Sequence, residues 1–209
     1  METRKNLSDA ELLQLMLTGD AEALAILYER RQRNIYRFAL QMSGSTTIAE
    51  DITQEVFLVL IHNGANFDVA RGSLSNFLLG VARNHVLRRL QRERFYAPMI
   101  ETEEHGDHEL LLPRELTSSG GPLDDLARTE TIESVRKAVL ALPERYREVV
   151  VLCDLQEMSY VETADILGCA VGTVRSRLHR ARTLLINKLR PAREAEAAAA
   201  DLNSTRCFA

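Results

Sequence analysis

Apolar residues recur at three- and four-residue steps along most of the chain, which is the spacing of one face of an α-helix. Ser8 and Glu11 form a capping box ahead of the first apolar stripe, and Asp20 can cap the second. Gly19 and Gly44 follow the ends of these stripes. Further stripes cover about 48–60, 73–96, 132–142, 143–155, 159–167 and 172–190. No segment alternates convincingly with period two, so the pattern predicts an all-α fold.

The helical stripes fall into two groups separated by a segment of different character. Residues 97–126 contain Pro98, Pro113 and a Ser-Ser-Gly-Gly run at 118–121, and they lack a sustained apolar period. A structureless loop of this length is unusual inside one compact domain. We therefore expect two small helical domains, 1–96 and 127–190, joined by a flexible acidic linker at 97–126 and followed by a tail at 191–209 that could be helical or frayed.

The formal net charge of −4 hides a segregation of charge along the chain. Residues 166–193 contain no acidic residue, and 95–113 contain five acidic residues but no lysine or arginine. One basic cluster consists of Arg175, Arg177, Arg180, Arg182, Lys188, Arg190 and Arg193, and another of Arg83, Arg88, Arg89, Arg92 and Arg94. This arrangement indicates two contacts with one polyanion, although two solvated helix faces would give the same pattern.

Composition excludes several other classes of protein. The longest apolar runs, such as 56–61, are far shorter than the roughly 20 residues that span a bilayer, and the N-terminus lacks the apolar core of a signal peptide. Three cysteines without a CxxC pair predict neither disulfides nor a zinc site. We therefore expect a cytoplasmic protein without membrane insertion.

Catalytic and metal-binding signals are weak. His105, Asp107 and His108 could contribute to a metal site, but no ligand set is completed in the sequence. Redox control through Cys169, at the turn after 159–167, is conceivable but has no supporting pattern. No nucleophile elbow, phosphate-binding glycine loop or catalytic carboxylate pair is present. We expect no cofactor, no metal and no enzymatic activity.

Residues 159–182 have the pattern of a helix-turn-helix: a short capped helix, a turn containing glycine, and a second helix with a basic face. Val174, Leu178, Ala181 and Leu185 are predicted to point inward, and Arg175, Ser176, His179 and Arg182 outward with Arg180 at the flank. Such a helix fits the major groove, where arginine can donate two hydrogen bonds to guanine. Arg177 and Lys188 are better placed for phosphates. A basic amphipathic helix could instead contact a membrane or a partner protein.

Several motifs resemble bacterial sigma factors. ALPERYREVV at 141–150, SYVETADILG at 159–168 and VGTVRSRLHRAR at 171–182 resemble their region 4. Gly19-Asp20, AEDITQEVF at 49–57, VARN at 81–84 and Arg88-Arg89 resemble their region 2. Both matches occur in the family's order with no room for a folded region 3 between them, a layout similar to the extracytoplasmic-function (ECF) group.

The resemblance implies roles for the first domain. Region 2 of this family binds a coiled coil of the RNA polymerase β′ subunit, and the matching surface here has Asp51, Gln54, Glu55 and Leu58. Region 2 also melts the −10 promoter element and holds a flipped base. The corresponding parts are the loop 67–76 and a base pocket lined by Asn84, with Phe77 at a position where the family often has tryptophan. Arg83, Arg88, Arg89 and Arg92 would hold the DNA backbone.

The resemblance also implies roles for the rest of the chain. Region 4 would recognise the −35 duplex through Arg175, Ser176, His179 and Arg180. The acidic linker would either mimic nucleic acid in polymerase channels or serve as a plain tether. The implied partners are core RNA polymerase, through its β′ and β subunits, promoter DNA and an anti-sigma factor, which could hold the protein at the membrane. The alternative is a stand-alone helix-turn-helix regulator, which would have no use for a melting domain.

Overall fold

The computed structural model describes residues 4–68, 72–96 and 122–206. Within these ranges the regular structure is helical and contains no strand, so the predicted all-α class is confirmed. The linker segment 97–121, with its acidic residues and both histidines, lies outside the described residues, as do 69–71 of the loop expected to act at −10. Residues 122–126, which we assigned to the linker, belong to a helix that begins at Pro122.

The N-terminal unit contains four α-helices and two short 3₁₀ segments. They are η1 (Arg4–Asn6), α1 (Asp9–Leu17), α2 (Ala21–Ser43), α3 (Thr46–Asn63), η2 (Gly64–Asn66) and α4 (Leu74–Tyr96). The side chain of Ser8 caps α1 in the predicted capping box, and Asp20 caps α2. Gly44 ends α2 in the left-handed conformation (φ +75°), which a glycine adopts without steric cost. The sequence thus encodes these helix ends locally.

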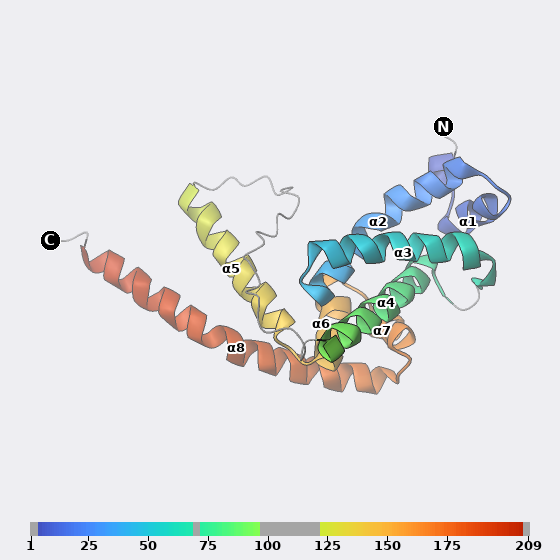
Figure 1. Ribbon diagram of the computed structural model, residues 1–209. Helices are drawn as coiled ribbons and strands as arrows, with labels where there is room; N and C mark the ends of the chain where they lie inside the picture. The colour runs from blue at the N-terminus through green and yellow to red at the C-terminus, as the bar shows by residue number, and fades with distance from the viewer. Residues whose placement is uncertain (1–3, 69–71, 97–121, 207–209) are drawn as a thin grey trace.

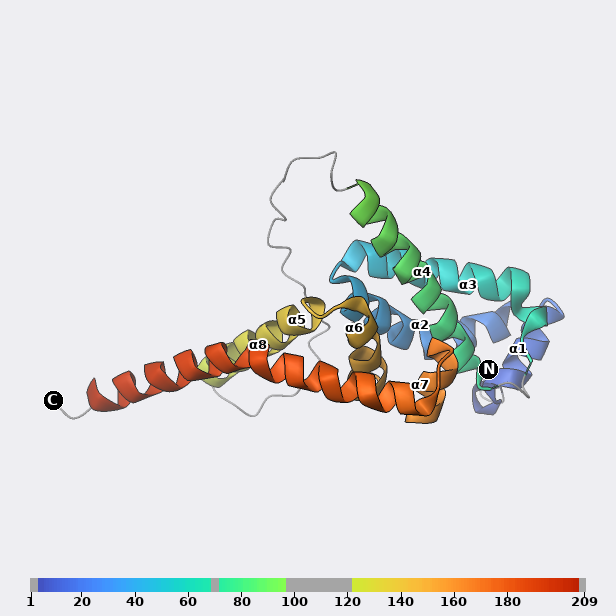
Figure 2. The same ribbon diagram turned by 90° about the horizontal axis from the view of Figure 1, so that it is seen from below.

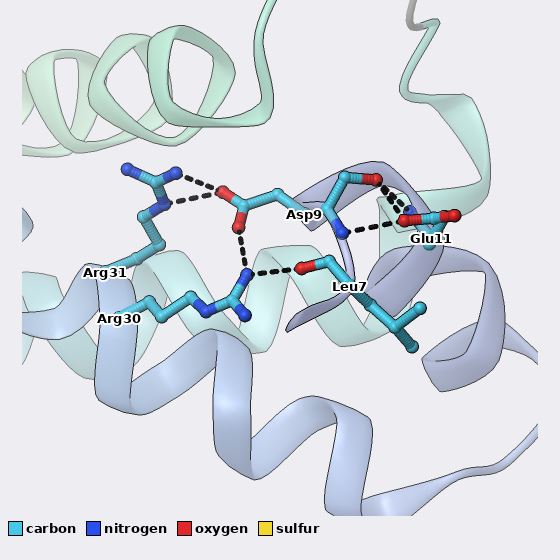
Figure 3. A network of polar contacts seen from close by, with 6 residues as sticks. Leu7, Asp9, Glu11, Arg30 and Arg31 are labelled. Carbon is cyan, nitrogen blue, oxygen red and sulfur yellow. Dashed lines mark hydrogen bonds and ion pairs between the residues drawn. The ribbon is translucent and has the colours of Figure 1, made fainter. Parts of the chain in front are cut away.

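A network of polar contacts ties α1 to α2 (Figure 3). The Asp9 carboxylate accepts a hydrogen bond from Nε of Arg31 at 2.6 Å and one from Nη1 of Arg30 at 3.1 Å. The same Nη1 of Arg30 also donates to the Leu7 carbonyl at 2.8 Å. These contacts fix α1 over the core formed by α2, α3 and α4, where Leu12 and Leu13 are buried.

The C-terminal unit contains α5 (Pro122–Leu140), α6 (Glu144–Val150), a π-helical turn η5 (Val151–Leu155), α7 (Tyr160–Leu167) and α8 (Val171–Arg206). The stripe at 143–155 had predicted one continuous helix. Instead the hydrogen-bond ladder widens after α6, and the Gln156 amide donates to the Val151 carbonyl at 2.9 Å. Apolar spacing does not distinguish a π turn from an α turn over so few residues.

Helix α8 is longer than expected. The sequence predicted a helix to about residue 190 and left the tail open, whereas α8 continues to Arg206. Pro191 removes one backbone donor but does not end the helix. The alanine-rich residues that follow have high helix propensity and carry the helix onward. The C-terminal part of α8 projects away from the remaining described helices in both views (Figures 1 and 2).

The two units pack against each other rather than standing apart. Helix α4 contacts α7, and α2 contacts both α5 and η5 (Figures 1 and 2). The buried apolar side chains form one continuous cluster that runs through both units. At one point of contact, Leu140 of α5 lies against Gly44, where an added Cβ would come within 2.8 Å of the leucine Cδ1. The two sequence-defined helical groups therefore share a core in this structure.

Candidate nucleic-acid interface

The helix-turn-helix forms as the sequence predicted. Ser159 and Glu162 make the capping box of α7, and hydrogen bonds from Ser159 hold the pKa of the Glu162 carboxyl below its usual value. Gly168 ends α7 in the left-handed conformation (φ +62°), so that the chain turns into α8 within a few residues. Val174 and Leu178 on α8 are buried, and α7 packs against α8. The turn and these contacts fix the angle at which α8 presents its outer face.

The outer face of α8 carries the predicted DNA-contacting residues. Arg175, Ser176, His179, Arg180 and Arg182 are exposed, and Arg177 is half-buried. The Arg175 guanidinium lies over the Tyr160 ring, 5.8 Å from its centroid. This contact orients a side chain that remains accessible. Five of the six predicted −35 residues therefore share one solvent-facing surface.

Two further arginines of this surface have partners in the C-terminal unit. Arg182 donates from Nε and Nη2 to the two carboxylate oxygens of Asp154, at 3.1 and 2.6 Å. Hydrogen bonding to Asp154 raises the pKa of Arg182. A hydrogen bond with Arg180 lowers the pKa of Tyr146 on α6. Because Asp154 is in the π turn, this turn holds Arg182 in a fixed orientation. Neither partner was recognised from the sequence.

The residues predicted to act at −10 do not all lie on one exposed surface of α4. Asn84, Arg88 and Arg89 are exposed. Arg83 instead makes an ion pair with Glu148 of α6 at 2.6 Å. Phe77 is half-buried against Phe67, with ring centroids 5.5 Å apart. The structure therefore brings Asn84 and two arginines together on one surface and places Arg83 and Phe77 in intramolecular contacts.

The predicted polymerase-binding residues share the outer face of α3. Asp51, Gln54, Glu55 and Leu58 are all exposed. Ile61, one helical turn after Leu58, is 46% exposed and extends the apolar part of this face. Ile61 was not predicted to belong to this face, because it ends a continuous apolar run in which buried and exposed positions look alike. Glu55 also contacts Nδ1 of His85 on α4, a residue that the sequence analysis did not single out.

A polar groove lies beside this face. It has a volume of about 420 Å³, and Gln54 lines one wall. Tyr28, Arg33 and Tyr36 of α2 line the opposite wall. Burial and the nearby Glu50 carboxylate raise the pKa of Tyr36 above its ordinary value. Residues of α2 thus adjoin the predicted binding surface, which the sequence had placed on α3 alone.

Two other kinds of site, metal centres and membrane spans, have neither a ligand cluster nor an apolar helix to support them in ranges 4–68, 72–96 and 122–206. In the ranges 4–68, 72–96 and 122–206, no group of three or more potential ligands could hold a metal ion. His105, Asp107 and His108 lie outside these ranges. No helix among the described residues is both long enough and apolar enough to span a membrane.

Burial raises the pKa of the Cys153 thiol, whose Sγ lies 3.3 Å from Oγ1 of Thr163.

Comparison with known proteins identifies the family. Residues 27–96 match Sigma-70 region 2, and residues 132–185 match Sigma-70, region 4. The ECF RNA polymerase sigma factor SigW of Bacillus subtilis is 32% identical over 175 residues, which cover 82% of this chain and 91% of SigW. The chain belongs to the ECF group of the sigma-70 family. ECF RNA polymerase sigma factor SigM of Mycobacterium tuberculosis is also 32% identical, over 89% of this chain and 87% of SigM.

Solved structures of sigma factors share the fold. One is the sigma factor RpoE of Bartonella quintana in complex with the anti-sigma factor NepR, with a TM-score of 0.60 and 24% identity over 78% of this chain and 94% of that one. Another is CnrH in complex with the cytosolic domain of CnrY, with a TM-score of 0.62 and 23% identity over 88% of this chain and 97% of that one. Along the present chain, the region 2 match covers most of α2 and all of α3 and α4. The region 4 match extends from α5 into α8 and contains the whole helix-turn-helix.

Proposed function

We propose that this sigma factor binds core RNA polymerase and directs it to promoters by recognising the −35 and −10 elements and assisting melting at −10. The observation that carries the proposal is the presence of both regions in one chain, with the basic face of α8 exposed. A stand-alone helix-turn-helix regulator would not account for the region 2 match over 27–96. The polymerase would supply all covalent chemistry, so the sigma factor itself would not be an enzyme.

For the −35 element, we assign base recognition to the exposed residues of α8. Arg175 is accessible near the start of the helix, where recognition helices contact base edges. Ser176, His179 and Arg180 continue the same face, while Arg177 and Arg182 are assigned to the phosphate backbone. Asp154 neutralises part of the charge of Arg182 and fixes its direction, which suits a positioning contact more than sequence readout.

For the −10 element, the proposal assigns a base contact to Asn84 on α4. An amide both donates and accepts, so it can read the edge of an unpaired base. Arg88 and Arg89 are exposed one helical turn further along and would hold the DNA backbone. Phe77 offers an aromatic face for stacking only if its contact with Phe67 rearranges. Arg83 can join them only after leaving Glu148.

The remaining partners are proposed from the α3 surface and from relatives. Leu58 and Ile61 give α3 an exposed apolar patch, with the carboxylates of Asp51 and Glu55 on the same helix, and this patch fits a coiled coil of the β′ subunit. RpoE of Bartonella quintana is in complex with an anti-sigma factor, which supports the same class of partner here. We expect such a partner to control when the sigma factor reaches the polymerase, from the cytoplasm or at the membrane.

Run-off transcription tests the proposal. Purified core polymerase is mixed with the full chain and a library of promoter fragments, and transcripts are sequenced to locate their start sites. The proposal predicts defined start sites that share two upstream elements and that are absent with core enzyme alone. If the chain alone bound duplex DNA tightly while the polymerase remained inactive with it, a stand-alone regulator would be the better description.

Arg175→Ala should relax recognition at one −35 position and cost about 1–3 kcal/mol in promoter binding, as expected for loss of a two-bond contact with guanine. The same library assay measures the change as a flattened base preference at that position. Arg190→Ala serves as the matched control, because Arg190 is exposed on α8 beyond the helix-turn-helix. An unchanged base profile for Arg175→Ala would contradict the assignment.

Asn84→Ala should reduce transcription from −10-dependent promoters by roughly tenfold, because a base contact of about 1–3 kcal/mol is lost from a surface side chain. Binding to core polymerase should stay unchanged, since Asn84 is on α4 and not on the exposed face of α3. Asn187→Ala, at an exposed position of α8, provides the matched control. Equal loss of core binding and transcription would show that Asn84 supports the fold instead.

A further inference from the structure

An arginine of α6 lies beside the exposed basic face of α8 and was not among the predicted DNA contacts. Helix α6 packs against α8 (Figures 1 and 2). Arg145 on α6 is exposed, and its guanidinium carbon lies 4.8 Å from the centroid of the Tyr146 ring. The hydroxyl of Tyr146 accepts hydrogen bonds from Arg180, on the exposed face of α8, and from Arg145. One tyrosine side chain therefore joins an arginine of α6 to an arginine of α8.

We propose that Arg145 binds a backbone phosphate at the edge of the −35 site, next to the base contacted by Arg180, and that the Tyr146 hydroxyl positions both guanidinium groups. The inference rests on the proposed function, which assigns Arg180 to recognition of −35 bases. It adds a DNA contact from outside the helix-turn-helix, because α6 precedes α7 and α8 in the chain. Arg145 is the residue that touches DNA, and Tyr146 acts through the two arginines.

The place of Arg145 favours a phosphate over a base. The major groove is about 12 Å wide, and an α-helix with its side chains is about 10–12 Å across, so one helix fills the groove. A side chain from a helix packed beside it then meets the sugar-phosphate backbone at the edge of the groove. Arg145 comes from such a neighbouring helix. Its guanidinium group can donate two hydrogen bonds to phosphate oxygens, so its chemistry agrees with this place.

The charges around Tyr146 favour an anion at the same place. Arg180 lowers the pKa of Tyr146 through a hydrogen bond, and the charges of Arg145 and Arg180 lower it further. Among the residues that the structure describes, neither of these arginines makes an ion pair with a carboxylate. Arg182, by contrast, donates to both oxygens of Asp154. A DNA phosphate would supply to Arg145 and Arg180 the negative charge that Asp154 supplies to Arg182.

The burial of Tyr146 allows it to position two long side chains. Tyr146 is 8% exposed and belongs to the buried core, so packing holds its ring in place. A free arginine side chain carries about 2 kcal/mol of rotamer entropy, part of which is lost when it binds. The ring restricts Arg145 and the hydroxyl restricts Arg180 before DNA arrives. This restriction reduces the entropy that each arginine loses on the promoter.

Neutral backbone linkages test the contact of Arg145 with a phosphate. Holoenzyme is assembled from core polymerase and the full chain, and its binding to promoter fragments is measured by fluorescence anisotropy. Each fragment carries one methylphosphonate in place of one phosphate near the −35 element. One such linkage should weaken binding of the wild type about fivefold, whereas Arg145→Gln should bind about fivefold more weakly from the start and be insensitive to that linkage. The slope of log K against log salt should become shallower by about 1 in Arg145→Gln.

Arg190→Gln is the matched control, because Arg190 is exposed on α8 beyond the helix-turn-helix and the substitution removes the same charge. This variant should keep the wild-type sensitivity to the linkage that Arg145→Gln no longer detects. A general loss of positive charge would weaken binding to all fragments alike, so it could not produce insensitivity at a single linkage.

Tyr146→Phe tests the positioning role, since it keeps the ring and removes only the hydroxyl. The −35 position contacted by Arg180 is defined as the one whose base preference Arg180→Ala flattens in the promoter library. We expect Tyr146→Phe to reduce the preference at that position about threefold, and the double variant to add nothing to Arg180→Ala. A purely structural role of the hydroxyl would affect all promoters equally and would not select one position.

Three results would overturn the inference. In the first, Arg145→Gln remains as sensitive as the wild type to every neutral linkage. In the second, Arg145→Gln weakens binding to core polymerase and leaves the salt slope unchanged, which would make Arg145 a polymerase contact. In the third, Tyr146→Phe leaves the base preference at the Arg180 position intact. The wild-type holoenzyme would still initiate at defined start sites in all three cases, so failure of the inference is distinguishable from failure of the proposed function.

Discussion

Arg147→Met should lower the free energy of unfolding by about 3–5 kcal/mol, measured by urea denaturation followed by circular dichroism. The Arg147 guanidinium donates to three carbonyls, those of Met42, Leu140 and Leu142, and so joins the end of α2 to the end of α5. Hydrogen bonds from a charged donor contribute about 1.5–3 kcal/mol each, and some of the freed carbonyls regain water. Methionine preserves the apolar stem and removes the guanidinium that makes these contacts.

Arg145→Met is the control for this experiment. Arg145 is exposed on the same helix, and its guanidinium lies 4.8 Å from the centroid of the Tyr146 ring. Such an exposed cation–π contact contributes about 0.5–1 kcal/mol, so the control should change stability only slightly. If the two variants lost equal stability, the three carbonyl contacts of Arg147 would not be what holds the ends of α2 and α5 together.

Leu58→Glu should weaken binding to core polymerase by at least about 30-fold, which corresponds to roughly 2 kcal/mol. Leu58 is 53% exposed on α3 and is followed one turn later by Ile61, which is 46% exposed. A carboxylate at the centre of this apolar patch would be buried against the coiled coil without a partner. The fold should be unaffected, because the side chain faces solvent. Fluorescence anisotropy of labelled sigma factor titrated with core enzyme measures the change.

Ile186→Glu is the control for Leu58→Glu, because it makes the same apolar-to-acidic change on a different helix. Ile186 is 60% exposed on α8, beyond the helix-turn-helix, and its substitution should leave core binding within about twofold of the wild type. Should both variants bind core enzyme equally well, the α3 patch would not be the polymerase-binding surface. Circular dichroism of both variants checks that helicity is retained.

The sequence alone was sufficient to predict helix ends and buried helix faces, because nearby residues determine both. Ser8, Asp20 and Ser159 each precede a helix that they cap, as their spacing to the next polar or apolar residues predicted. Val174 and Leu178 recur at four residues and are buried, which leaves Arg175 and His179 exposed. In each case residues within one or two helical turns decide the outcome, so the signal is contained in a short window of sequence.

Contacts between distant residues were not predictable in this way. Arg83 and Glu148 are 65 positions apart, and Arg37 donates to the Leu155 carbonyl across 118 positions. No periodicity connects such pairs, and a charged residue on a helix face is most often solvated. Arg182 and Asp154, 28 positions apart, were missed for the same reason. The π turn at Val151–Leu155 was missed because its apolar residues also fit an α-helix.

The continuous core has a consequence for synthesis of the chain on the ribosome. Helices α1 to α4 are complete at Tyr96, but Leu140, Arg147 and Gln156, which cover the end of α2, are made later. At about 5–20 residues per second, the ribosome needs roughly 3–12 s to reach them. During that interval a newborn N-terminal unit has α1 to α4 complete, and Arg83 is without its carboxylate partner Glu148. The contacts that α5, α6 and the segment after η5 make with α2 therefore form only after the N-terminal helices have been synthesised.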